Sequence, residues 1–153
     1  MAAAIALAAP VKAEPGVLFR ALTEKEGLAS FWTDDCDAEP VVGSIGRFGF
    51  PGGSNVEVRV DELEPGRVAW TMLTDTLRGP RWTGTKVTWA LKRGEEGFTE
   101  VLFRQTGWPV DLDQGDWRTS LAGLTFAWAG VLRALKAYAE TGSAQPHFTT
   151  MPR

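Results

Sequence analysis

The sequence has few of the residues from which reactive and metal-binding sites are usually built. It contains one cysteine, Cys36, and one histidine, His147. A single cysteine cannot form an internal disulfide, and this fits a reducing, cytoplasmic location. One cysteine and one histidine also cannot complete a closed zinc site. We therefore expect neither a metal nor a cofactor.

The sequence also lacks the charge and hydropathy patterns of nucleic-acid-binding and membrane proteins. Its net charge is −3, so no basic surface for phosphate groups is expected. No segment of the sequence is long and apolar enough to span a bilayer. The alanine-rich residues 1–15 lack the basic region that begins a secretory signal peptide. We interpret them as a first strand with Ile5 and Leu7 on its buried side, and expect neither nucleic acid nor a membrane as a partner.

Tryptophan is the residue type that is unusually frequent, with seven among 153 residues. The composition is otherwise ordinary for a globular protein, with 44% hydrophobic and 23% charged residues. One domain of this length buries roughly two-thirds of the surface that its unfolded chain exposes. The tryptophans provide more aromatic area than such a core needs, so they either fill a wide gap or line a pocket.

Two short helices are expected near the start of the chain. Pro15 suits the first turn of one helix, where its missing N–H costs nothing. Thr23 and Glu26 have the spacing of a capping box, which predicts that a second helix begins there. Phe31 and Trp32 fall on one side of that second helix.

From residue 37 to residue 107 the hydrophobic pattern repeats every second residue, which predicts strands. Segments rich in turn-forming residues separate these strands at 51–54, 64–67 and 93–97. Short turns between successive strands predict an antiparallel meander. The side chains expected to share an inward face are Phe48 and Phe50; Val56, Val58 and Val60; Val87, Trp89 and Leu91; and Val101, Phe103 and Gln105.

A long amphipathic helix is predicted over residues 116–141, ended by Gly142. Trp117 and Trp128 belong to its apolar stripe, whereas Phe126 points away from that stripe. Phe126 is therefore either a single exposed aromatic residue or part of a contact with another subunit.

The candidate catalytic and metal-ligating residues are few. His147 is not accompanied by a G-x-S-x-G motif, so we favour a structural role for it. Asp34, Asp35 and Asp37 could hold a hard cation through their oxygen atoms. The segment lacks the glycine and the bidentate glutamate of a calcium loop, so we favour solvated carboxylates at the end of a helix.

Gln105 is the polar residue that alternation places on the inward face, together with Val101 and Phe103. A buried amide must find hydrogen-bond partners. A backbone carbonyl or a water molecule would satisfy it within the protein. The polar group of a ligand is the alternative.

Six segments, in this order, carry a resemblance to a known family: VLFRALTEKEGLASFWT, VGSIGRFGF, VEVRVDELEPGRVAWTM, WTGTKVTWAL, TEVLFRQTGW and LRALKAYAETG. They resemble the START-like superfamily, also called SRPBCC, and within it the branch similar to the C-terminal domain of the activator of heat-shock protein 90 ATPase. The resemblance implies an α+β helix-grip fold, as in the birch pollen allergen. In this fold a bent antiparallel sheet of about seven strands wraps around the C-terminal helix, accompanied by two short helices. We expect this domain over residues 1–142 and a C-terminal tail over residues 143–153.

The resemblance also implies a cavity between the sheet and the long helix, where relatives bind lipids, polyketides, hormones or other apolar molecules. We therefore expect a binding protein for a small hydrophobic or aromatic ligand. The expected cavity-lining residues are Trp32, Phe48, Phe50, Trp89, Phe103, Gln105 and Trp128. Many proteins of this branch have a histidine where this chain has Gln105. A neutral amide cannot act as a general acid or base at ordinary pH, so we assign no catalytic residue.

Two alternative functions stay open. A cyclase, aromatase or hydrolase would take its acid–base groups from Asp34, Asp35, Arg47 or Arg104, although alternation places Arg104 on the face opposite Phe103. An interaction module, either a homodimer or a chaperone partner, would use Phe126 and the outer face of the sheet. The sequence has no counterpart of the co-chaperone's N-terminal domain, so we do not expect stimulation of a chaperone ATPase.

Overall fold

The computed structural model describes residues 4–76, 82–108 and 115–150, with side chains in the last helix from residue 120 onward. Within these residues it contains a seven-stranded antiparallel sheet and three helices, which confirms the predicted α+β helix-grip fold. Trp117, predicted on the apolar stripe of the last helix, lies outside the described side chains. The elements are β1 (Ile5–Val11), α1 (Pro15–Thr23), α2 (Lys25–Phe31), β2 (Asp35–Asp37), β3 (Ile45–Gly49), β4 (Asn55–Glu64), β5 (Arg67–Asp75), β6 (Lys86–Arg93), β7 (Thr99–Thr106) and α3 (Gly115–Thr141).

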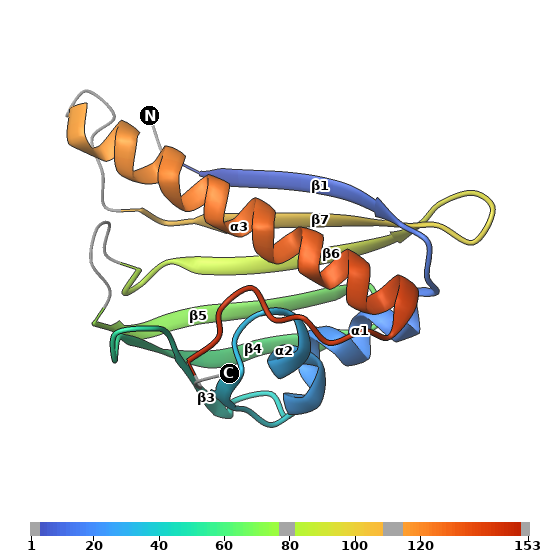
Figure 1. Ribbon diagram of the computed structural model, residues 1–153, viewed down its shortest axis with the longest axis horizontal. Coiled ribbons are helices and arrows are strands. Elements are labelled where there is room, and N and C mark those ends of the chain that lie inside the picture. Colours follow the sequence, from blue (N-terminus) through green and yellow to red (C-terminus); the bar gives the residue numbers. More distant parts are fainter. Residues whose placement is uncertain (1–3, 77–81, 109–114, 151–153) are drawn as a thin grey trace.

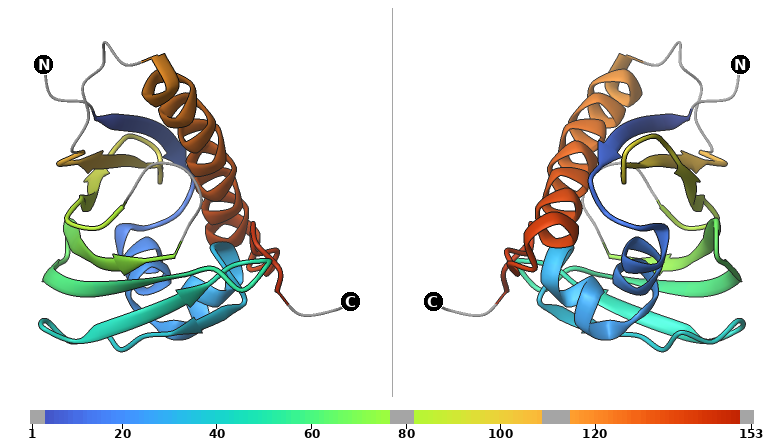
Figure 2. Two further views of the ribbon diagram at one scale, coloured as in Figure 1. Left: turned by 90° about the vertical axis from the view of Figure 1, so that its left-hand side faces the viewer. Right: turned by 90° about the vertical axis from the view of Figure 1, so that its right-hand side faces the viewer.

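The sheet bends around α3, which crosses its concave side diagonally (Figures 1 and 2). Its strand order is β1–β7–β6–β5–β4–β3–β2, so the first strand pairs with the last one. The register of β4 against β5 shifts twice, between Glu57 and Val58 and between Val60 and Glu62. Such bulges increase the local twist and bend of a sheet. Helices α1 and α2 lie on the same side of the sheet as α3, near its C-terminal half (Figure 1).

The period-two pattern correctly predicted which side chains the strands turn toward α3. In β1, Ile5 is buried and Leu7 half-buried, whereas Ala6 between them is exposed. The residues assigned to the inward face of the other strands are all buried, namely Phe48, Phe50, Val56, Val58, Val60, Val87, Trp89, Leu91, Val101, Phe103 and Gln105.

The predicted capping box that starts at Thr23 is wrong. Because α1 continues through Thr23, its hydroxyl faces the preceding turn and donates to the carbonyl oxygen of Phe19 at 2.8 Å. Glu24 has extended backbone angles and begins α2 without a side-chain hydrogen bond. The two helices meet so closely that a Cβ atom on Gly27 would lie 2.5 Å from the backbone of Ala21. A glycine is therefore required at this contact.

Helix α3 ends as predicted, at Gly142. This glycine has a φ of 76°, and its N–H donates to the carbonyl oxygen of Tyr138 at 2.8 Å, which is a common way to end a helix. On α3, Trp128 and Leu135 are buried on the side that faces the sheet, whereas Phe126 is 81% exposed on the outer side, as the pattern predicted. None of the described helices is long and apolar enough to cross a membrane.

Candidate ligand cavity beside an aromatic cluster

The aromatic side chains on the concave side of the sheet form one connected cluster. Trp32, directly after α2, stacks on Trp70 with ring centroids 5.7 Å apart and lies 4.4 Å from Phe48. Trp128 of α3 lies 5.4 Å from Trp32 and 4.4 Å from Phe103. Trp32 is 1% and Trp128 2% exposed. The cluster is therefore a packed part of the core.

A cavity of about 1010 Å³ lies at the edge of this cluster. One side is the β3–β4 turn at residues 51–54, and another is the face of α3 that carries Ser120, Gly123, Leu124, Ala127 and Val131. The aromatic side chains on its wall are Trp32, Phe50, Trp82, Trp128 and Phe148. Because Trp32 and Trp128 are almost fully buried, each presents only a small part of its surface to the cavity.

The seven residues predicted to line a cavity fall into two groups. Those that line it are Trp32, Phe50 and Trp128. Those that lie in the packed core outside its wall are Phe48, Trp89, Phe103 and Gln105. Alternation along a strand shows that a side chain points inward, but not whether it meets another ring or an open space.

Gln105 is fully buried, and its hydrogen bonds are satisfied inside the protein. Its side-chain nitrogen donates to Thr85 Oγ1 at 3.0 Å, and its side-chain oxygen accepts from Trp128 Nε1 at 2.9 Å. An indole N–H can only donate, which fixes the orientation of the amide. The hydroxyl of Thr85 donates in turn to the carbonyl oxygen of Trp82 at 2.6 Å. The hydrogen-bond partners of the amide are thus two side chains of the protein. From the sequence, a backbone carbonyl, a water molecule or a ligand had been considered as the partner.

Trp82 is a cavity residue that the sequence did not identify. One carboxylate oxygen of Asp75 accepts hydrogen bonds from the backbone N–H groups of Trp82 and Thr83, at 3.0 and 2.9 Å. The indole of Trp82 then lies 5.5 Å from that of Trp128. Trp82 precedes β6, so no strand or helix periodicity marks it.

Phe148 is the other aromatic residue that the sequence did not identify, and it comes from residues 143–150, which we call the C-terminal strap. The strap runs from the end of α3 back toward β3 (Figure 1). The backbone N–H of Phe148 donates to the carbonyl oxygen of Trp32 at 2.9 Å, and its carbonyl oxygen accepts from the N–H of Asp34 at 3.3 Å. Its ring packs edge-on against Phe50, with centroids 5.0 Å apart.

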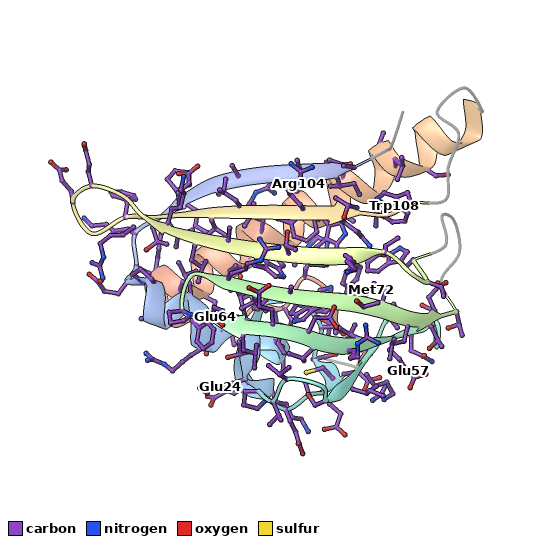
Figure 3. The ribbon with its side chains drawn as sticks, turned by 180° about the vertical axis from the view of Figure 1, so that it is seen from behind. Glu24, Glu57, Glu64, Met72, Arg104 and Trp108 are labelled. Carbon is purple, nitrogen blue, oxygen red and sulfur yellow. The ribbon has the colours of Figure 1, made fainter. Side chains whose placement is uncertain are left out.

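The charged residues considered for catalysis or cation binding either bind other protein groups or lie on the far face of the sheet. The carboxylate of Asp34 accepts hydrogen bonds from the backbone N–H and hydroxyl of Thr150, at 2.8 and 2.7 Å. Asp35 pairs with Arg47 at 2.7 Å on an exposed strand edge. Arg104 lies on the face of the sheet turned away from α3 (Figure 3). In the parts of the chain that the structure describes, no three acidic, histidine or cysteine side chains are grouped to hold a metal.

The part of the cavity wall that the structure describes carries no charge. None of the described residues that line it is ionisable. Its described residues include three with hydroxyl groups, Ser54, Thr76 and Ser120. Hydroxyl groups can both donate and accept hydrogen bonds, so they suit a carbonyl or hydroxyl group of an uncharged molecule.

Burial is the main cause of the pKa shifts of His147 and Cys36. Burial lowers the pKa of His147, and the positive charge of Arg133 lowers it further. Burial raises the pKa of the Cys36 thiol, which keeps it protonated and unreactive at neutral pH. Neither residue is among those described on the cavity wall.

Comparison with protein families gives a match over most of the chain. The family described as Activator of Hsp90 ATPase homolog 1-like protein matches residues 12–140. A search of curated proteins found no match.

Several solved structures share the fold. The solution structure of the Aha1 dimer from Colwellia psychrerythraea is 30% identical, with a TM-score of 0.72 over 92% of this chain and 98% of that chain. Protein MLL2253 from Mesorhizobium loti is 20% identical, with a TM-score of 0.73 over 88% and 94% of the two chains. DynU16, from the dynemicin biosynthetic locus, is 22% identical, with a TM-score of 0.75 over 92% of this chain and 48% of that chain. At these identities the last two show the fold alone.

Proposed function

The chain belongs to the family of Activator of Hsp90 ATPase homolog 1-like proteins, and from this premise we propose that it binds a small, uncharged aromatic or hydrophobic molecule in the cavity beside α3. The observation that carries this proposal is the composition of the cavity wall, where the described residues include five aromatic side chains and three hydroxyl groups but no charge. Ligand pockets are typically about 300–1,000 Å³, mostly apolar, with a few polar groups that orient the ligand. A volume of about 1010 Å³ lies at the upper end of this range.

We propose binding without catalysis, because the candidate acid–base residues Asp34, Asp35, Arg47 and Arg104 are not among the described residues of the cavity wall. A general acid or base must reach within hydrogen-bond distance of the reacting atom. Asp34 is engaged by the C-terminal strap, and Arg104 lies on the opposite face of the sheet. Both ends of the Gln105 amide are engaged by protein side chains. These contacts disfavour the cyclase, aromatase and hydrolase alternatives.

The test compares two fluorescent probes of similar size that differ in charge. N-phenyl-1-naphthylamine is neutral, whereas 1-anilinonaphthalene-8-sulfonate carries a negative charge. We expect the neutral probe to bind more tightly, because a sulfonate would lose its hydration without gaining a counter-charge. Denaturing the purified protein and analysing the extract by mass spectrometry would identify a co-purified ligand. Absence of any extracted molecule, together with no binding of the neutral probe, would refute the proposed function.

Phe126 favours a second candidate function, the association of two copies of the chain. Its side chain is 81% exposed on the outer side of α3, away from the cavity. The relative from Colwellia psychrerythraea is described as a dimer. A homodimer that covers Phe126 would remove this aromatic surface from water, which stabilises association. Ligand binding and dimer formation use opposite sides of α3 and are compatible.

A further inference from the structure

The C-terminal strap supplies a part of the cavity wall that lies outside the family match, which ends at residue 140. Phe148 is the strap residue on that wall, and its edge-on partner Phe50 lines the same cavity. The other described wall residues belong to α3, to the β3–β4 turn, or to segments next to strands and helices of the core. Phe148 is thus the wall residue whose position depends on the docking of a terminal segment.

Backbone hydrogen bonds attach the strap to the end of α2. The N–H groups of His147 and Phe148 donate to the carbonyl oxygens of Phe31 and Trp32, at 3.0 and 2.9 Å. The last carbonyl groups of a helix have no partner within the helix. The strap therefore satisfies acceptors that α2 leaves free, in a register that directs Phe148 toward Phe50.

Side-chain contacts attach the strap at two further points. Thr150 donates its backbone N–H and its hydroxyl to the carboxylate of Asp34. The imidazole of His147 lies directly on α3, so close that a Cβ atom on Gly130 would be 2.3 Å from its Cε1 atom. An alanine at position 130 would therefore force the imidazole of His147 to move.

We propose that the C-terminal strap is part of the ligand site and that Phe148 is a specificity-determining residue of it. This inference rests on the proposed function, because it concerns the same uncharged aromatic ligand. When the strap is docked, Phe148 offers the ligand a ring to pack against and limits the space beside Phe50. When the strap is released, this wall is missing and a bound ligand dissociates faster.

Gly130→Ala tests the strap without changing the cavity wall, because Gly130 is not among the lining residues. The added methyl group overlaps with His147 and should displace it. His147→Ala in the same chain removes that overlap, so the double variant should behave like His147→Ala alone. Phe148→Ala removes the ring but keeps the backbone hydrogen bonds of the strap. Thermal unfolding of each variant checks that the rest of the fold is intact.

Two measurements separate docking from ligand binding. Hydrogen exchange of the Phe148 amide reports docking, and stopped-flow fluorescence of N-phenyl-1-naphthylamine reports its dissociation rate. In Gly130→Ala we expect both rates to rise about tenfold, since docking through few contacts is a local equilibrium. In Phe148→Ala we expect faster dissociation with the amide still protected.

Each outcome decides between the proposals. Wild-type protein that binds no neutral probe and releases no co-purified molecule would refute the proposed function and this inference together. Wild-type binding with unchanged probe kinetics in Phe148→Ala would refute this inference alone. The same holds if Gly130→Ala exposes the Phe148 amide but leaves probe dissociation unchanged. If Gly130→Ala leaves the strap docked, the inference is tested by Phe148→Ala alone: faster probe dissociation supports it, and unchanged dissociation refutes it.

Discussion

Trp128 donates its indole N–H to the side-chain oxygen of Gln105 across 2.9 Å inside the core. This hydrogen bond joins α3 to β7 on the deep side of the cavity. Both side chains are buried, so removing either one leaves a polar atom of the other without a partner. The position of Trp128, which lines the cavity, therefore depends on Gln105, which is not among the lining residues.

Trp128→Phe and Trp89→Phe form a matched pair that measures this hydrogen bond. Both substitutions replace a buried indole by a smaller ring, but Trp89 Nε1 has no hydrogen-bond partner among the described residues. Only Trp128→Phe leaves the Gln105 oxygen without its donor. We expect Trp128→Phe to lower the free energy of unfolding by about 1–3 kcal/mol more than Trp89→Phe. Urea denaturation measures the difference, and equal losses would show that the hydrogen bond does not contribute.

Trp128→Ala tests how far the ring belongs to the packed core. The side chain is 2% exposed and contacts several rings, so we expect a loss of about 3–5 kcal/mol in the free energy of unfolding. Chemical denaturation gives this value. A loss below about 1 kcal/mol, far less than core truncations cost, would mean that the ring faces a space that is already empty.

The docking of the C-terminal strap should depend on pH through His147. Burial, and then the charge of Arg133, lower the pKa of His147 below its ordinary value of 6.5. A released strap therefore binds a proton more readily than a docked one. Its docking free energy is fully present above pH 6.5 and decreases as the pH falls through 6.5 toward the lowered pKa.

Hydrogen exchange of the Phe148 amide, corrected for the intrinsic effect of pH, should show this loss of protection in acid. The matched control is His147→Gln, which keeps a polar side chain but cannot be protonated near neutral pH. We expect the protection factor of the control to change less over the same pH interval. An identical pH dependence in both proteins would show that another group is responsible.

Phe126→Ser tests whether the outer side of α3 forms a contact between two copies. Val42→Ser is the matched control, because Val42 is also a largely exposed hydrophobic residue but lies between β2 and β3. We expect sedimentation equilibrium to show a wild-type dimer that Phe126→Ser weakens and Val42→Ser does not. A monomeric wild-type protein at high concentration would contradict the homodimer.

Features that repeat along the chain could be predicted from the sequence. Alternation placed Gln105 and Trp89 on the inward face, and the helical stripe placed Trp128 inside and Phe126 outside, because each pattern reports the direction of a side chain from its own element. The start of α2 could not be predicted in this way. Whether Thr23 caps the second helix or continues the first depends on backbone angles that the spacing of residues does not fix.

The limits of the cavity depend on contacts between distant segments. Gln105 binds Trp128, 23 positions away, and Asp34 binds Thr150, 116 positions away. No local pattern encodes either pairing. Phe148 was not expected on the cavity wall for the same reason, since its hydrogen bond to Trp32 joins distant segments. Trp82 was not expected because it lies in a turn outside the regular elements, where a hydrogen bond to Asp75 places it.

The affinity of an Ala127→Leu variant for N-phenyl-1-naphthylamine tests most directly whether the cavity beside α3 binds ligands. Ala127 lines the cavity, whereas Ala122 is exposed on α3 and does not. A larger side chain at position 127 occupies the space of the ligand, so we expect the affinity to fall about tenfold or more. Ala122→Leu should retain the wild-type affinity. Equal affinities for the wild type and Ala127→Leu would contradict the proposed site.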